Sequence, residues 1–134
     1  MEEVILKTVA AFLNTQGGTL LIGVADDSSI VGLEFDYQTL KKRDRDGFEL
    51  WLMGDLLLKE MGKSIAPYLS VTFHTVDDQD VCKIAIDPAP EPVYVDIRDK
   101  SGQLCETFFI RTGNSTNKLE KPSEITKYIK QRWG

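Results

Sequence analysis

A pair of glycines between a helical pattern and an apolar strand constrains the fold of this chain more than any other feature. Apolar residues recur at helical spacing over residues 4–13. Gly17-Gly18 then offers a left-handed helix cap without steric cost. The short apolar run at residues 19–24 follows directly, and it predicts a strand buried on both faces within a sheet centre. The chain is therefore expected to turn from a helix straight into a sheet.

Further along the chain, turn and cap residues separate the next elements. A turn at residues 26–29 is expected to return the chain as a short partner strand at 30–33. Asp44 or Asp46 can then cap a second helix over residues 47–61, because a carboxylate accepts hydrogen bonds from the free amides of the first turn. These patterns predict a strand pair followed by a helix.

The second half of the chain is rich in strands. Alternating residues at 69–75 and 81–86 flank an acidic turn and predict a hairpin. Three prolines at alternate positions make residues 87–92 an extended loop. The remaining elements are expected to be strands at 93–97 and 107–111 and a helix that begins at Pro122. The order αββαββββα predicts an α+β fold: a mixed, mostly antiparallel sheet with about three packed helices.

The composition fits one globular domain spanning residues 1–134. The net charge of -5 opposes strong non-specific binding to a polyanion, although a local basic patch stays compatible with it. No apolar run approaches the roughly 18 residues that span a bilayer. Cys82 and Cys105 favour two buried thiols in a cytoplasmic protein over a disulfide. Because Glu2 and Glu3 open a helix directly after Met1, we expect a fragment of a longer chain.

Two aspartates at the end of the predicted central strand are candidate metal ligands. Asp26 and Asp27 offer oxygen donors that suit a divalent cation such as Mg²⁺. Aspartates also form local turns by bonding to their own backbone, and that interpretation is favoured. The neighbouring Gly17-Gly18 lacks the GxxxxGK[ST] pattern and precedes a strand, so it predicts a structural turn and no phosphate loop.

A second polar cluster follows the last predicted strand. Arg111, Asn114, Ser115 and Thr116 carry the donors that a phosphate or nucleic-acid backbone site uses. A turn whose side chains bond to their own backbone explains the same residues equally well. Lysines then make the C-terminal quarter the basic part of an acidic chain, beginning with Lys118 and Lys121. A solvated helix face and a nucleic-acid patch both fit this charge.

Several motifs in this order resemble the Schlafen-type Alba-like domain. They read AAFLNTQGGTLLIGVADDSSIVGLE, PAPEPVYV, FFIRTGNSTNKL and YIKQRW, and they cover nearly the whole chain. The resemblance implies a DNA-binding domain of the kind found in bacterial helix-turn-helix regulators and in proteins once labelled divergent AAA-type ATP-binding. It also implies that the domain is one part of a larger chain.

The resemblance also bears on catalysis. In animal Schlafens the related domain cleaves RNA with three acidic residues, two of them on a strand with a Glu-Phe-Lys pattern before the first helix. Only the third has a counterpart here, and it falls on Asp26. The strand with the other two is missing from this chain, and its loss is expected to expose a sheet edge that could pair with another chain.

Three interpretations follow. The first is a regulatory nucleic-acid-binding domain, for DNA more than RNA, that is not catalytic in isolation and contacts phosphates through Arg111, Asn114, Ser115, Thr116 and the lysines Lys118 and Lys121. The second is the remnant of a metal-dependent nuclease or an ATP-binding domain, with Asp26 as a ligand. The third is an interaction module that forms homo-oligomers through the exposed sheet edge. The residues alone separate the three poorly, and the resemblance favours the first.

Overall fold

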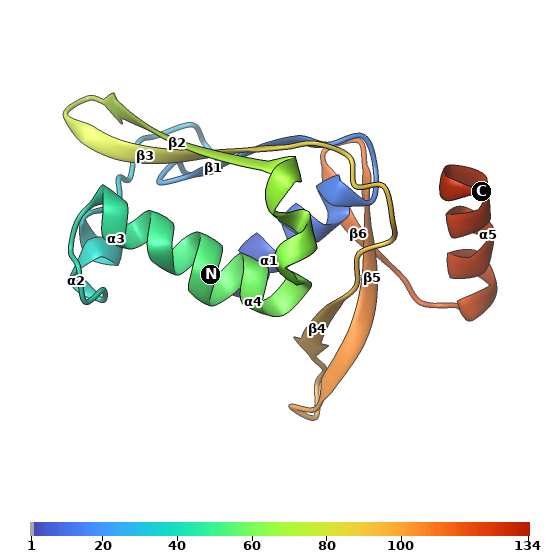
Figure 1. The fold of residues 1–134 in the computed structure, drawn as a ribbon. Helices are drawn as coiled ribbons and strands as arrows, with labels where there is room; N and C mark the ends of the chain where they lie inside the picture. The colour runs from blue at the N-terminus through green and yellow to red at the C-terminus, as the bar shows by residue number, and fades with distance from the viewer. Residues whose placement is uncertain (1) are drawn as a thin grey trace.

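Six strands form two antiparallel sheets in the computed structural model, which describes residues 2–134. The first sheet has the order β1-β3-β2 and the second the order β4-β5-β6. The strands are β1 (Gly18–Ile22), β2 (Leu69–Val76), β3 (Gln79–Ile86), β4 (Val95–Arg98), β5 (Leu104–Thr112) and β6 (Ser115–Leu119). The predicted α+β class is confirmed, although the strands are divided between two sheets that meet at an angle (Figure 1).

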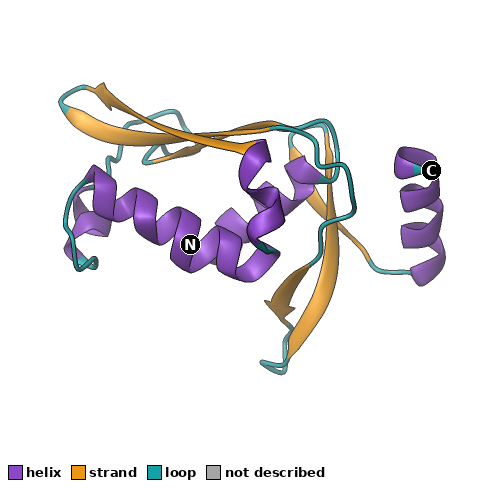
Figure 2. Ribbon diagram, in the orientation of Figure 1, coloured by secondary structure: helices purple, strands orange, loops and turns teal. Residues whose placement is uncertain are grey.

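The helices lie in the angle between the sheets, except for the last one (Figure 2). Helix α1 and the run from α3 to α4 lie under the first sheet, while α5 stands on the opposite side of the second sheet (Figure 1). The helices are α1 (Glu2–Leu13), α2 (Glu34–Gln38), α3 (Arg45–Leu50), the π-helix (Trp51–Leu57), α4 (Leu58–Met61), the 3-10 helix (Lys63–Tyr68) and α5 (Pro122–Trp133). None of the described helices is long and apolar enough to cross a membrane.

Two helix caps lie where the sequence predicts them. The carboxylate of Asp44 accepts a hydrogen bond of 2.8 Å from the amide of Gly47 at the start of α3. At the end of α1, Gly17 adopts φ +75° and donates its amide to the carbonyl of Phe12 at 2.9 Å. A Cβ on Gly17 would lie 2.3 Å from the carbonyl oxygen of Ile86. The glycine pair is therefore a structural turn.

Two strand predictions are wrong in position. Strand β1 pairs only with β3, so it is an edge strand, and Leu21 is 47% exposed where burial on both faces was expected. Residues 30–33 do not form a partner strand, because the chain makes one bridge there, between Val24 and Ile30. Gly32 then turns the chain away with φ +81°.

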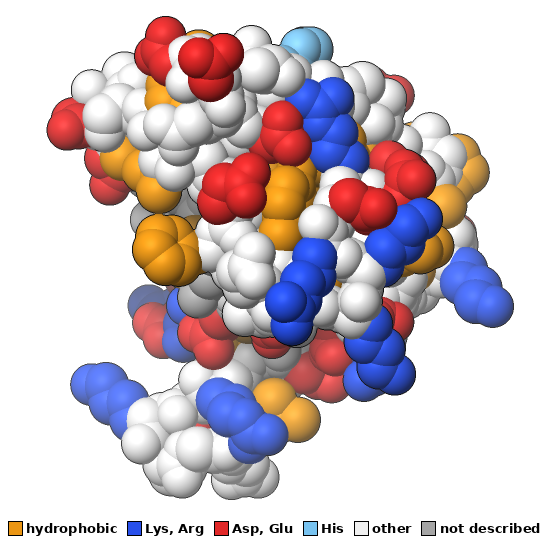
Figure 3. All heavy atoms as spheres, turned by 90° about the vertical axis from the view of Figure 1, so that its left-hand side faces the viewer, with side chains coloured by type: hydrophobic (Ala, Val, Ile, Leu, Met, Phe, Trp, Pro, Cys, Tyr) orange, Lys and Arg blue, Asp and Glu red, His pale blue; other side chains and the backbone are white. Residues whose placement is uncertain are grey.

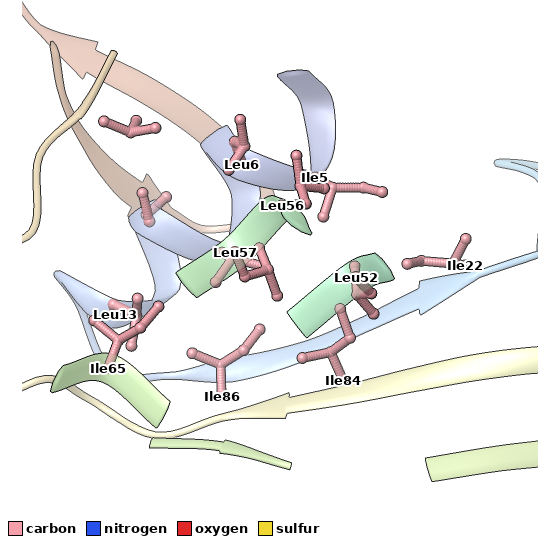
Figure 4. Close-up of a cluster of buried hydrophobic side chains, with 14 of the residues drawn as sticks. Ile5, Leu6, Leu13, Ile22, Leu52, Leu56, Leu57, Ile65, Ile84 and Ile86 are labelled. Carbon is pink, nitrogen blue, oxygen red and sulfur yellow. The ribbon is translucent and has the colours of Figure 1, made fainter. Parts of the chain in front are cut away.

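One apolar core fills the angle between the sheets. Helix α1 contributes one face and the π-helical run another, and β1 and β3 pack against both (Figure 4). The labelled core residues are Ile5, Leu6, Leu13, Ile22, Leu52, Leu56, Leu57, Ile65, Ile84 and Ile86. Burial of this apolar surface is the main force that holds the two sheets in their relative position.

The buried side chain of Asn14 joins the end of α1 to the second sheet. Its amide nitrogen donates to the carbonyls of Val93 and Phe109 at 2.8 and 2.9 Å, and its oxygen accepts from the amide of Val93 at 2.8 Å. Its own backbone carbonyl accepts the hydroxyl of Tyr128 in α5. One residue therefore bonds to the segment before β4, to β5 and to α5.

An aromatic cluster attaches α5 to the other side of the second sheet. The ring of Phe108 in β5 lies 5.8 Å from that of Tyr128 and 6.4 Å from that of Trp133, both edge to face. The indole nitrogen of Trp133 donates to the carbonyl of Ala89 at 2.9 Å. These contacts place α5 against the sheet although none of its residues is fully buried.

A polar network fixes α2 and α3 against the β2–β3 hairpin. The carboxylate of Asp80 accepts the hydroxyl of Tyr37 at 2.6 Å and the guanidinium of Arg45 at 2.7 Å. The hydrogen bond from Arg45, followed by that from Tyr37, lowers the pKa of Asp80. Burial is the first cause that raises the pKa of Tyr37. The ionised carboxylate is thus the centre of the contact.

We expect Asn14→Ala to lower the free energy of unfolding by about 2–4 kcal/mol, because it leaves three buried backbone groups without partners. The matched control is Asn117→Ala, whose exposed side chain bonds only to Thr112, with a loss within about 0.5 kcal/mol. Urea unfolding measures both, and equal losses would contradict the role given to Asn14.

We expect Asp80 to give the fold an acid-sensitive contact. Because its pKa in the folded state lies below the ordinary value of 3.8, its stabilisation is present above that value and is lost as the pH falls through the folded pKa. Asp80→Asn should therefore flatten the dependence of the unfolding free energy on pH below about 4. The exposed Asp55→Asn is the control, and the same flattening in both variants would argue against the network.

Candidate nucleic-acid interface

The β5–β6 hairpin holds the polar cluster that the sequence singled out. The guanidinium of Arg111 donates to the hydroxyl of Thr116 at 2.8 Å and to the carbonyl of Asn114 at 2.9 Å. It also lies over the ring of Phe12, 4.9 Å from the centroid. Arg111 is therefore half-buried and engaged within its own hairpin, where it holds the turn against α1.

Alternation along β5 sorts side chains between the two sides of the second sheet. Phe109 packs into the main core on the α1 side, and Phe108 faces the aromatic cluster at α5. In the register of β5 and β6, Thr116 lies opposite Arg111. Lys118 lies opposite Phe109. Because directly opposed residues share a face, both point to the α1 side.

An open groove of about 930 Å³ lies on this α1 side, between α1, the β4–β5 turn, β5 and β6. We call it the basic groove. The cationic side chains among its lining residues are Lys7, Arg98, Lys100 and Lys118. Asp99 is the one carboxylate among these lining residues. A local excess of positive charge therefore sits on a chain whose net charge is -5.

The cations of the groove are only loosely engaged. Lys7 pairs with Glu3 at 3.0 Å, and Lys118 pairs with Glu120 at 3.3 Å; in each pair both side chains are at least one-third exposed. Arg98 donates to the carbonyl of Gly102 at 2.7 Å. Exposed ion pairs of this kind contribute little to stability. The lysines can therefore exchange these partners for an anionic ligand.

The carboxylate of Asp99 is directed into its own turn. It accepts hydrogen bonds from the amide and hydroxyl of Ser101 at 2.9 and 2.6 Å and from the amide of Gln103 at 3.0 Å. The hydroxyl of Ser101 is the first cause that lowers the pKa of Asp99. Its charge thus serves to close the β4–β5 turn. This turn is the lowest part of the molecule in Figure 1, and Figure 3 shows Lys and Arg side chains there.

The prediction of two buried thiols is wrong for Cys105. Cys82 is buried in β3, whereas Cys105 is exposed at the open end of β5, and both are free. Because the start of β5 extends beyond the core, this thiol is exposed to solvent. Its hydrogen bond to Asp99, 3.5 Å away, is the first cause that raises the pKa of Cys105.

Apolar side chains also line the groove. They are Val4 of α1, Ile97 of β4 and the buried Phe109 of β5. The ammonium of Lys7 lies 5.9 Å from the centroid of that ring. Val4 is 62% exposed. The lining of the groove thus combines apolar and cationic side chains.

The structure brings part of the predicted site together. Thr116 and Lys118 line the basic groove, and Asn114 and Ser115 are exposed at the tip of the hairpin. Lys121 lies at the N-cap position of α5, outside the groove lining. Residue pattern alone missed the other cations of the groove, which are Lys7, Arg98 and Lys100.

The predicted cation ligand lies elsewhere. Asp26 is exposed in the loop after β1, and β1 leads away from the β5–β6 hairpin toward the left of Figure 1. The adjacent Asp27 accepts hydrogen bonds from the amide and hydroxyl of Ser29 at 2.9 and 2.6 Å, which is the local turn that the sequence favoured. Within residues 2–134, no three or more His, Cys, Asp or Glu side chains gather as metal ligands.

Fold and groove together define a small α+β domain with a basic groove beside its first helix. The chain belongs to the family described as Schlafen, AlbA_2, whose model matches residues 1–120. The DIP2311 protein of Corynebacterium diphtheriae is similar in structure, with a TM-score of 0.60 and 24% sequence identity. The match covers 99% of this chain and 20% of that one, so this chain spans about a fifth of that protein. Among curated proteins, no match is found.

We expect Arg111→Ala to lower the free energy of unfolding by about 1–2 kcal/mol, because the hairpin loses two charged hydrogen bonds and the contact with Phe12. Lys118→Ala, with its exposed ion pair, should stay within about 0.5 kcal/mol of the parent chain. Urea unfolding compares them. An Arg111→Ala variant as stable as the parent chain would contradict this structural role and would leave Arg111 free to bind phosphate.

Proposed function

We propose that this chain is a nucleic-acid-binding domain of a regulatory protein, with DNA as its ligand and with no catalysis of its own. The observation that carries this proposal is the basic groove, which gathers four cations from three separate parts of the chain. Membership of the Schlafen AlbA_2 family supports a nucleic-acid-related role. The finer assignment to DNA and to regulation is ours.

The distribution of charge supports a polyanion as ligand. On a chain with net charge -5, most of the surface repels phosphates at long range. The groove is the exception, since four cations and one locally engaged carboxylate line it, and the carboxylates paired with Lys7 and Lys118 are exposed outside that lining. A nucleic acid would therefore bind in one place and orientation and would not coat the surface. Binding should fall steeply with salt, because each phosphate contact releases counterions.

The residues divide into two roles. Lys7, Lys100 and Lys118 have flexible ammonium groups and would contact phosphates. The hydroxyl of Thr116 accepts from Arg111, so its own proton is available to a phosphate oxygen. Arg111 acts by positioning this hydroxyl. The exposed Asn114 extends the polar surface beyond the end of the groove.

The test is binding of labelled DNA and RNA at several salt concentrations, measured by fluorescence anisotropy. We expect Lys100→Ala combined with Lys118→Ala to weaken DNA binding about tenfold at 0.1 M salt and to lower the salt slope by about 2. The matched control combines Lys41→Ala with Lys59→Ala, two exposed lysines outside the groove.

Absence of binding to both nucleic acids at low salt would overturn the proposal. Equal losses of DNA affinity in the two double variants would show that the cations act only through net charge. This result too would contradict the groove as the binding site. Binding to RNA without binding to DNA would overturn the choice of DNA.

A further inference from the structure

We propose that a second pocket, between the loop after β3 and the 3-10 helix, binds an alkylammonium group, the charged end of a small free amine or of a lysine side chain. The loop consists of residues 87–94, joins β3 to β4 and runs beside the 3-10 helix (Figure 1). We call it the proline loop and the hollow the loop pocket. The loop pocket shares no lining residue with the basic groove, so this inference goes beyond the proposed function and does not rest on it.

The loop pocket has the size of a site for one small group. Its volume is about 280 Å³, at the lower end of the range of about 300–1,000 Å³ in which proteins hold small ligands. Its walls come from Met61 at the end of α4, from the 3-10 helix and from the proline loop. A short alkyl chain with one polar end fits such a volume.

The charge of the lining selects a cation. Glu91 is the one charged residue among the lining residues of the loop pocket, and no Lys, Arg or His is among them. Its side chain is exposed and forms no ion pair with another residue of the described chain. The basic groove has the opposite balance, with four cations and one carboxylate. The two hollows therefore favour ligands of opposite sign.

The backbone of the proline loop offers hydrogen-bond acceptors and few donors. Its three prolines have no N–H group. The amides of Asp87, Ala89 and Val93 each donate to another part of the fold at 2.8 Å, so up to Val93 only Glu91 keeps a free amide within the described structure. The carbonyls of residues 90–92 accept no hydrogen bond from the described chain. An ammonium group, which has three donors and no acceptor, matches this backbone.

Aromatic and apolar side chains complete the lining. Tyr68 of the 3-10 helix and Tyr94 of the proline loop are both lining residues and both half-buried. The ring of Tyr94 lies 5.1 Å from that of Phe108, which supports it from the second sheet. Aromatic rings attract cations, and Met61 and Ile65 offer apolar contact to an alkyl chain. An alkylammonium ion thus finds partners for its charge, its N–H groups and its carbon chain in one place.

The proline loop is held in place before any ligand binds. The amide of Ala89 donates to the carbonyl of Leu13 at 2.8 Å, and its carbonyl accepts the indole N–H of Trp133 at 2.9 Å. Val93 bonds to the side chain of Asn14 through both its amide and its carbonyl. A ligand therefore meets a preformed wall and does not have to order it, which favours binding of a small group.

The experiment adds n-butylammonium chloride or n-butanol to the isotope-labelled chain at about pH 7 and follows the backbone amide chemical shifts. The two probes have the same size and differ in charge. The key variant is Glu91→Gln, and the matched control is Glu34→Gln, because Glu34 is exposed and lies outside the pocket lining. A second pair, Tyr68→Leu and Tyr68→Phe, removes either the aromatic ring or only its hydroxyl. Thermal unfolding checks that all four variants fold.

We expect n-butylammonium to shift the amides of the proline loop and the 3-10 helix and to bind at least about fivefold more tightly than n-butanol. Glu91→Gln should weaken n-butylammonium binding about fivefold, because it removes the one charge in the lining. Glu34→Gln should leave it unchanged. Tyr68→Leu should weaken it about threefold, whereas Tyr68→Phe, which keeps the ring, should leave it nearly unchanged.

Equal affinity for n-butylammonium and n-butanol would overturn the inference, and so would the absence of shifts in the proline loop. Equal losses of affinity in Glu91→Gln and Glu34→Gln would overturn it as well, because the cation would then respond only to the net charge of -5. Putrescine and N-acetyl-lysine amide distinguish the two sources of the group. Tighter binding of putrescine would support a free amine, and tighter binding of the lysine amide would support a lysine side chain.

Discussion

The buried amide of Asn14 is the contact on which the relation between the two halves of the fold depends. It lies where α1 ends, and its three hydrogen bonds satisfy backbone groups of Val93 and Phe109 that would otherwise be buried without partners. The hydroxyl of Tyr128 bonds to the backbone carbonyl of Asn14 from the other side of the second sheet. Since unpaired buried amides are costly, few other arrangements of α1 against this sheet are accessible.

This anchoring gives the basic groove its shape. One wall is α1 and the other is the second sheet, and both are held by Asn14 and by the core around Phe109. The groove's cations come from positions as distant in sequence as Lys7 and Lys118, and only the packing of α1 on β5 brings them together. A preformed groove binds its ligand without first ordering its own backbone, which favours affinity.

Local signals were sufficient for most elements and insufficient for the site. The caps at Asp44 and Gly17 and the β2–β3 hairpin follow from residue types at short range. The π-helix has no such signal, and the division into two sheets depends on pairings between distant segments. The polar turn after β5 was found because its residues are adjacent in the sequence. Arg98 and Lys100 were missed because only the β4–β5 pairing and the fold against α1 place them beside Lys118.

The measurement that tests the nucleic-acid groove most directly is the change in backbone amide chemical shifts of the isotope-labelled chain as DNA is added. We expect the changes to concentrate in the first turns of α1, the β4–β5 turn and β6, and to leave the β2–β3 hairpin and the loop around Asp26 unaffected. Chemical-shift changes centred on the β2–β3 hairpin or on Asp26, with none along the groove, would contradict the assignment of the groove as the binding site.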